Sequence, residues 1–205
     1  MLTDLLKAPG VEEELELRST FGFMAFHGGV ERVTEVVASE AAERADASYY
    51  GVVQPEELQW HVPSKHIDPA HSERLAEFLD HVDIVVAVHG YGRKHLRWSL
   101  LLGGTNRPLA GHISAHLRPR LPAYEMVADL DAIPRELAGL HPDNPVNRPR
   151  HGGVQIELCP LVRWHIDGWG WSDSGEIGRA PQTESLILGL AEAARSWPRS
   201  SNGEL

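Results

Sequence analysis

Short apolar runs alternate along the chain with longer amphipathic segments, and this pattern predicts a series of strands and helices. Residues 20–26 and 83–88 are nearly continuous apolar runs, which are typical of strands buried on both faces of a sheet. Shorter runs of the same kind predict further strands at residues 48–53, 60–62, 98–102 and 153–158.

The amphipathic segments between these runs predict helices. Asp68 and Pro69 mark one helix start, because aspartate caps free N–H groups and proline suits the first helical position. The expected helices span about residues 30–44, 68–79, 108–117 and 182–196. Because strands and helices alternate, we predict an α/β fold in which a mostly parallel mixed sheet has helices on both faces.

The length of the chain sets its domain organisation. A chain of 205 residues can bury one sizeable core but is short for two domains. We therefore expect a single α/β domain over residues 20–197, a lead-in segment at residues 1–19 and a disordered tail at residues 198–205.

Composition narrows the class of protein and its compartment. The hydrophobic content of 42% and the charged content of 23% are ordinary for a soluble protein, and no run approaches the roughly 20 apolar residues that span a bilayer. Residues 1–7 do not resemble a signal peptide, so we expect a cytoplasmic protein. A formal net charge of −10 argues against nucleic-acid binding. The single cysteine, Cys159, excludes an internal disulfide and a multi-cysteine zinc site.

Polar residues at the ends of three predicted strands indicate a catalytic metal site. His27 and Glu31 enclose a Gly-Gly-Val turn after the first strand, His89 follows the second apolar run, and Glu157 lies within the last strand. In open α/β sheets, ligands usually bind beyond the carboxyl ends of the strands. Two histidines and a carboxylate suit catalytic zinc, and a further carboxylate can act as general base. We therefore predict a metal-dependent hydrolase.

The strand that contains Glu157 carries a second polar residue, Gln155. Strand alternation places both on the face opposite to Val154, Ile156 and Leu158. A carboxylate buried there would be costly unless it is paired, hydrogen-bonded or associated with a metal. This position therefore makes Glu157 a candidate for the general base.

Two further segments complete a set of motifs in a familiar order. They are His61-Val62-Pro63-Ser64-Lys65-His66-Ile67-Asp68-Pro69 and Asn147-Arg148-Pro149-Arg150-His151-Gly152-Gly153-Val154-Gln155-Ile156-Glu157-Leu158. With the His-Gly-Gly-x-Glu motif and the strand into His89-Gly90, their order resembles the poly-γ-glutamate hydrolase family of phages and bacteria, over about residues 21–163.

The resemblance implies a fold similar to the zinc carboxypeptidases and hydrolysis of γ-glutamyl amide bonds. It implies that zinc is bound by His27, Glu31 and His89, with Glu157 as general base or acid. The family places one more residue between the first histidine and the glutamate, and zinc carboxypeptidases place one fewer. Glu35, expected one helical turn further on, is therefore the alternative carboxylate ligand.

Several cations are candidates for binding the substrate or its developing oxyanion. Arg148 and Arg150 precede the Glu157 strand and are candidates for oxyanion stabilisation. Arg93 and Arg97 belong to a basic cluster after the His89 strand and could bind substrate carboxylates. We also assign Arg163, just beyond the Glu157 strand, and Ser64 to substrate binding.

The activity has two alternatives. One is a zinc-dependent deacylase of small N-acyl amino acids, which would suit the same site. The other is a catalytically silent binding protein, which the altered spacing between His27 and Glu31 favours. Ser64, His66 and Asp68 do not indicate a serine hydrolase, because a triad is assembled from separated segments.

Overall fold

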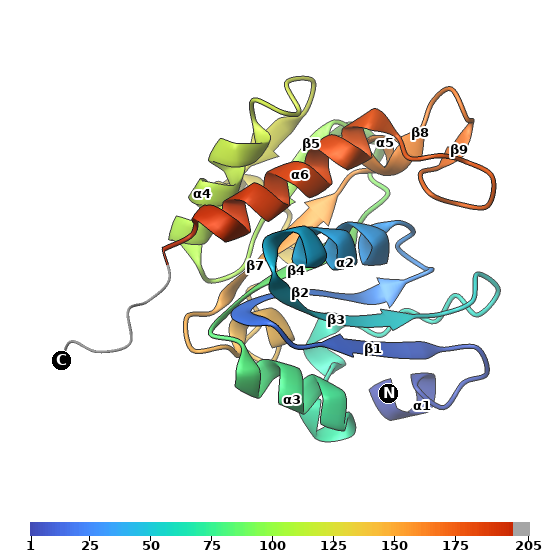
Figure 1. Ribbon diagram of the computed structural model, residues 1–205, viewed down its shortest axis with the longest axis vertical. Helices are drawn as coiled ribbons and strands as arrows, with labels where there is room; N and C mark the ends of the chain where they lie inside the picture. The colour runs from blue at the N-terminus through green and yellow to red at the C-terminus, as the bar shows by residue number, and fades with distance from the viewer. Residues whose placement is uncertain (199–205) are drawn as a thin grey trace.

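Seven strands form one sheet, in the order β1-β3-β2-β4-β7-β5-β6, within the described residues 1–198 of this computed structural model (Figure 1). Neighbouring strands are parallel, except that β1 is antiparallel to β3 and β5 is antiparallel to β7. The predicted mostly parallel mixed sheet is therefore confirmed. The strands are β1 (Glu12–Glu16), β2 (Ser19–Gly28), β3 (Ala47–Val53), β4 (Ile84–Gly90), β5 (Ser99–Leu102), β6 (Glu125–Val127) and β7 (Gly153–Leu158).

Helices cover both faces of this sheet, as predicted. One face carries α2 (Thr34–Ala45), α4 (Arg107–Leu117) and α6 (Pro181–Ser196), and the other carries α1 (Leu2–Leu5) and α3 (Glu73–His81) (Figure 1). After β7 the chain forms the short helix α5 (Pro160–Arg163) and a small hairpin of β8 (Trp164–His165) and β9 (Gly170–Trp171).

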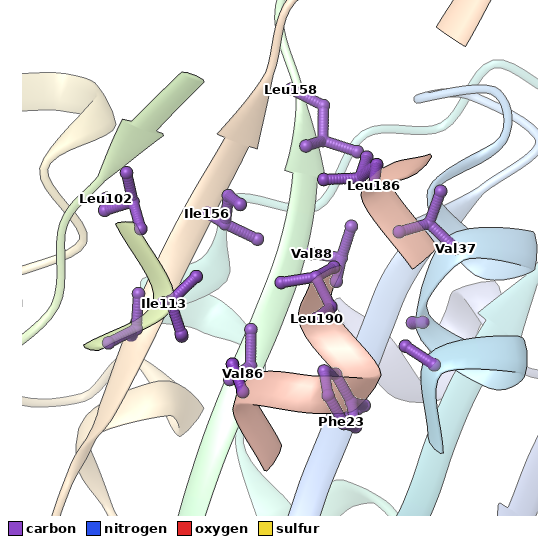
Figure 2. Close-up of a cluster of buried hydrophobic side chains, with 14 of the residues drawn as sticks. Phe23, Val37, Val86, Val88, Leu102, Ile113, Ile156, Leu158, Leu186 and Leu190 are labelled. Carbon is purple, nitrogen blue, oxygen red and sulfur yellow. The ribbon is translucent and has the colours of Figure 1, made fainter. Parts of the chain in front are cut away.

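Alternating side chains of the central strands supply two cores, one on each face. Val86 and Val88 of β4 pack with Leu190 of α6 (Figure 2), whereas Val85 packs in the cluster that contains Phe78 of α3. Each such fully buried side chain contributes about 1.5–3 kcal/mol. The continuous apolar runs of the central strands thus reflect burial on both sides.

The segment before residue 20, expected as a lead-in, contributes to the fold. It contains α1, whose Leu2 and Leu5 are fully buried, and the edge strand β1. The sequence of β1, Glu-Glu-Glu-Leu-Glu, is charged because an edge strand needs to bury little. The folded unit therefore begins before residue 20, whereas the expected tail, residues 198–205, lies outside the described residues except for Pro198.

The turn before α2 replaces the first part of the helix expected from residue 30. The backbone N–H groups of Val30 and Glu31 both donate to the carbonyl of His27, and α2 starts only at Thr34. Val33, just before it, has a left-handed φ of 74°. This turn releases Glu31 from the helix and directs it toward the end of β2.

Three other elements differ from what the sequence predicted. Asp68 caps a single 3-10 turn, Pro69–His71, and the helix proper begins at Glu73, where the Ser72 hydroxyl accepts from the N–H of Leu75 at 3.0 Å. Residues 60–62 form a loop instead of a strand, and the three-residue strand β6 was not expected. Within residues 1–198, no helix has the length and apolar character needed to cross a membrane.

Candidate metal centre

The predicted site residues meet at the carboxyl ends of three adjacent parallel strands. His27 lies near the end of β2, His89 near the end of β4 and Glu157 near the end of β7. His89 and Glu157 are direct register partners on neighbouring strands, and Glu31 comes from the turn after β2. Parallel strands end at one edge of a sheet, so residues far apart in sequence come together there.

Three of these side chains form a compact group of possible metal ligands. His27 Nδ1 lies 3.0 Å from Glu31 Oε1 and 3.2 Å from His89 Nδ1, and His89 Nδ1 lies 3.2 Å from Glu31 Oε2. The ligand atoms of the three residues all lie within 4.8 Å of one another. Both imidazoles are almost fully buried, at 1% and 3% exposure. The group could therefore hold a metal ion.

Hydrogen bonds around this group orient its lone pairs inward. His27 Nε2 lies 2.8 Å from the carbonyl oxygen of Val62. A carbonyl only accepts, so Nε2 carries the proton and Nδ1 presents a lone pair to Glu31 and His89. The backbone N–H of Gly90 donates to Glu31 Oε2 at 2.9 Å and fixes the carboxylate.

This donor set fits a cation at its centre. With His27 neutral, its Nδ1 lone pair and the Glu31 carboxylate face Nδ1 of His89, so a cation bound between these atoms would be attracted by each of them. Burial would raise the pKa of Glu31, but the neighbouring His27 and His89 hold it well below its ordinary value. The carboxylate is therefore ionised, and two imidazoles with one carboxylate are a common ligand set of catalytic zinc.

Glu157 faces the same group from β7 and is also buried, at 4% exposure. Gln155 donates from Nε2 to Glu157 Oε1 at 2.9 Å, and Asn144 donates from Nδ2 to Gln155 Oε1 at 2.8 Å. Gln155 and Glu157 thus share one face of the strand, as predicted. Burial raises the pKa of Glu157 to about 7, against the opposing effect of His89. A carboxylate with such a pKa can accept and return a proton near neutral pH.

A cavity of about 680 Å³ opens onto these residues. Ser64 lines it, together with Lys65 and His61 from the loop after β3. His61 Nε2 lies 3.4 Å from Glu31 Oε1, and the centre of its ring lies 4.3 Å from the centre of the His27 ring. Further lining residues come from the long segment between β6 and β7, namely Arg135, Glu136, Leu137, Gly139, Leu140, His141 and Asn144.

Four residues that line the cavity were not predicted from the sequence, namely Lys65, Arg135, His141 and Asn144. These residues lie on irregular loops and 3-10 turns, where no periodic pattern shows which way a side chain points. Lys65 and His61 belong to the motif of residues 61–69, so this motif was the one feature of the sequence that pointed to these lining residues. The cationic side chains that line the cavity could be found only from the folded chain.

Arg148 and Arg150 do not line the cavity, in contrast to the expected role in oxyanion stabilisation. Both are exposed and precede β7, so they lie near its amino end. Glu157 lies near the other end, about 13 Å further along a strand that rises about 3.3 Å per residue. Their closeness to Glu157 in sequence therefore does not bring them to the site.

The predicted substrate-binding arginines of the β4–β5 segment also lie outside the cavity lining. Arg93 forms an ion pair with Glu136, and its side chain is 40% exposed. Because Glu136 lines the cavity, Arg93 reaches the cavity wall only through this pair. Arg97 is exposed on the surface.

Arg163 is buried and Glu35 is half-buried, and neither lines the cavity. Arg163 is 3% exposed and is not among the lining residues, which contradicts its predicted contact with substrate. Glu35 lies within α2 and is not part of the ligand group, so the turn before the helix presents Glu31 instead. Burial raises the pKa of Glu35, and its Oε2 atom has no hydrogen-bond partner among the described residues. Cys159 is free and is fully buried.

Comparisons with known proteins identify the family and the fold of the chain. The family model described as poly-gamma-glutamate hydrolase matches residues 3–166, which is more than half of the chain. The structure is similar to that of a bacteriophage poly-gamma-glutamate hydrolase, with a TM-score of 0.77 and 21% identity over 94% of this chain and 92% of that one. No curated protein matches the sequence.

Two other solved structures share the fold. The zinc-free form of YndL has a TM-score of 0.75 and 20% identity, and the match covers 91% of this chain and 90% of that one. N-formylglutamate amidohydrolase from Ralstonia eutropha has a TM-score of 0.56 and 10% identity, with 92% and 96% of the two chains covered. On the extent of the family match, the chain belongs to the poly-γ-glutamate hydrolase family.

Proposed function

We propose that this protein is a zinc-dependent hydrolase of γ-glutamyl amide bonds. In this proposal His27, Glu31 and His89 hold the zinc ion and Glu157 is the general base. The observation that carries it is the convergence of the two Nδ1 atoms and the Glu31 carboxylate within 4.8 Å, with the proton of His27 held on Nε2 by Val62. Family membership and the similarity to the zinc-free form of YndL support the same assignment.

The chain's own groups supply the remaining parts of the reaction. When bound, zinc would act as a Lewis acid toward the scissile carbonyl and make water a stronger nucleophile near neutral pH. Glu157 accepts a proton from the attacking water and returns it to the leaving amine. Gln155 and Asn144 keep the Glu157 carboxylate in place through their chain of hydrogen bonds.

The lining of the cavity favours an anionic substrate. Lys65 and Arg135 both line it, in a chain whose formal net charge is −10. Charges further away than about 8 Å are screened at physiological salt, so the local cations decide what binds. A γ-glutamyl unit carries a free α-carboxylate, which such cations can bind. We therefore infer that the substrate is a γ-glutamyl polymer or a short γ-glutamyl compound.

The proposal is tested by removing and restoring the metal. The protein is stripped with a chelator, reconstituted with zinc and assayed for shortening of poly-γ-glutamate. We expect stripping to abolish activity and zinc to restore it. The Arg97→Ala variant should respond in the same way as the parent, because Arg97 is exposed and outside the cavity. Full activity in a strictly metal-free preparation would contradict the proposal.

The same assay distinguishes the two alternatives. Release of small acids from N-acyl amino acids without shortening of the polymer would identify a deacylase. Absence of bound zinc, with His27→Ala and His89→Ala leaving the protein's function unchanged, would identify a binding protein. The cytoplasmic location stays a prediction, to be checked by cell fractionation.

A further inference from the structure

Arg163 is a buried cation whose hydrogen bonds all go to the backbone. It ends α5, directly after β7, and is 3% exposed. Its Nη1 atom donates to the carbonyl of Arg32 at 2.8 Å, its Nη2 atom to that of Tyr91 at 3.2 Å and its Nε atom to that of Cys159 at 3.5 Å. A buried guanidinium needs such partners, because it presents five N–H donors.

The three carbonyls belong to the three segments that carry the candidate metal centre. Arg32 directly follows Glu31, Tyr91 lies two residues after His89, and Cys159 lies two residues after Glu157. These segments leave three different strands, β2, β4 and β7. One guanidinium therefore joins the chain just beyond each strand that contributes to the site.

Gly90 shows how closely this guanidinium approaches the site. A Cβ atom at position 90 would lie 2.6 Å from Cζ of Arg163, which is closer than a real contact allows. The N–H of the same glycine donates to Glu31 Oε2 at 2.9 Å. Arg163 therefore packs against the residue that orients the Glu31 carboxylate. On another side, Cζ lies 5.1 Å from the centre of the Trp171 ring.

The charge of Arg163 also bears on the site. Burial lowers its pKa, but an arginine remains protonated in proteins, and Glu31 and Glu157 act in the opposite direction. A buried positive charge near buried carboxylates offsets part of the cost of taking them out of water. Lysine could supply the charge but not the planar fork of donors that reaches three carbonyls.

We propose that Arg163 is a positioning residue of the metal centre. It holds Glu31, His89 and Glu157 in place relative to one another by donating hydrogen bonds to the backbone just beyond each of them. It does so without contact with the substrate, because it does not line the cavity. This inference rests on the proposed zinc site. It replaces the substrate-binding role expected for Arg163 from the sequence.

The test compares Arg163→Lys with the parent protein and with Arg179→Lys. Arg179 is a suitable control because it is partly buried and bonded to carboxylates, but it lies in a separate cluster with Glu40, Asp173 and Glu184. Zinc affinity is measured by competition with a chelator, and the visible spectrum of the cobalt(II) form reports ligand geometry. For Arg163→Lys we expect affinity to fall about 10- to 100-fold, as is typical when an outer partner of metal ligands is lost.

Kinetics then separate positioning from substrate contact. We expect Arg163→Lys to lower kcat with little change in KM, and Arg179→Lys to change neither. Zinc affinity and a cobalt spectrum equal to those of the parent would overturn the inference, and so would a raised KM with an unchanged kcat. If the parent itself binds no zinc, the proposed function fails instead, so the two failures are distinguishable.

A second variant reaches the same contact without removing the arginine. Gly90→Ala forces the guanidinium to move by placing a methyl group against it. We expect a fall in zinc affinity in this variant, and a smaller effect of the same change in the Arg163→Lys background. If Arg163→Lys does not fold, Gly90→Ala alone decides, and unchanged zinc affinity in a folded Gly90→Ala protein overturns the inference.

Discussion

Two clusters of charged side chains in this protein have opposite designs. One lies on the surface between α2 and α6, where Arg179 and Arg44 pair with Glu40, Glu184 and Asp173. The other is the buried centre of His27, Glu31, His89 and Glu157. Each acidic side chain of the surface cluster is paired with an arginine, and the side chains are 20–37% exposed.

The buried centre has a different arrangement of charged and polar atoms. Its imidazole Nδ1 and carboxylate atoms face one another, the neighbouring Arg163 donates to the backbone and not to them, and its members are at most 12% exposed. A cation bound between these atoms would offset part of the cost of burying them. Converging buried acceptors, and not the number of charges, thus distinguish the candidate site from the surface cluster. Substitutions in the two clusters should therefore have different effects.

Removing a candidate ligand should have the largest effect. His89→Ala takes one Nδ1 atom out of the group, so we expect loss of stoichiometric zinc and of hydrolysis. Zinc content by atomic absorption and polymer shortening are the measurements. Stoichiometric zinc in a folded His89→Ala protein would show that the metal lies elsewhere.

Glu157→Gln should leave zinc bound but slow the reaction. The amide keeps the size of the carboxyl group and cannot accept the proton, so we expect kcat to fall about 10²- to 10⁴-fold. Because Glu157 is not part of the three-residue ligand group, zinc content should match that of the parent. A kcat within twofold of the parent would remove Glu157 from the role of base.

Arg135→Ala should weaken substrate binding. Arg135 lines the cavity, and a hydrogen bond to a charged group contributes about 1.5–3 kcal/mol, so we expect KM for γ-glutamyl substrates to rise about 10-fold or more. Steady-state kinetics should show this rise for Arg135→Ala and not for Arg97→Ala, because Arg97 lies outside the cavity lining. An equal response in both variants would mean that only general electrostatic attraction is lost.

The surface cluster should affect stability and not catalysis. Arg179 holds the pKa of Glu40 below its ordinary value, and Arg44 does the same for Glu184. A lowered folded pKa stabilises above the unfolded value of about 4.3, and this stabilisation is lost as the pH falls through the folded pKa. Arg179→Ala should therefore cost about 1 kcal/mol of unfolding free energy at pH 7 and less at pH 3.

Urea unfolding at the two pH values measures this effect, and kcat serves as the second readout. We expect kcat to be unchanged, since the cluster has no residue in the cavity lining. A stability difference that stays the same from pH 7 to pH 3 would show that Arg179 acts through packing and not through its ion pairs.

Much of the fold followed from the hydrophobic pattern. The central strands were predicted because Val85, Val86 and Val88 leave no polar face, and helices were correctly expected on both sides of the sheet. The edge strands β1 and β6 were missed because an edge strand buries little and shows a weak apolar pattern. The parallel arrangement then brought His27, His89 and Glu157 to one end of the sheet.

The strands that carry the polar residues of the candidate site could be predicted from the sequence, because strand period and apolar runs show where each strand ends. Tertiary structure was needed to place Glu31, and not Glu35, beside His27 and His89, since the turn at Val33 separates Glu31 from the helix that contains Glu35. It also put Arg135 into the cavity and Arg163 beneath the site. The physical reason is that loop side chains take their direction from long-range contacts, which leave no period in the sequence.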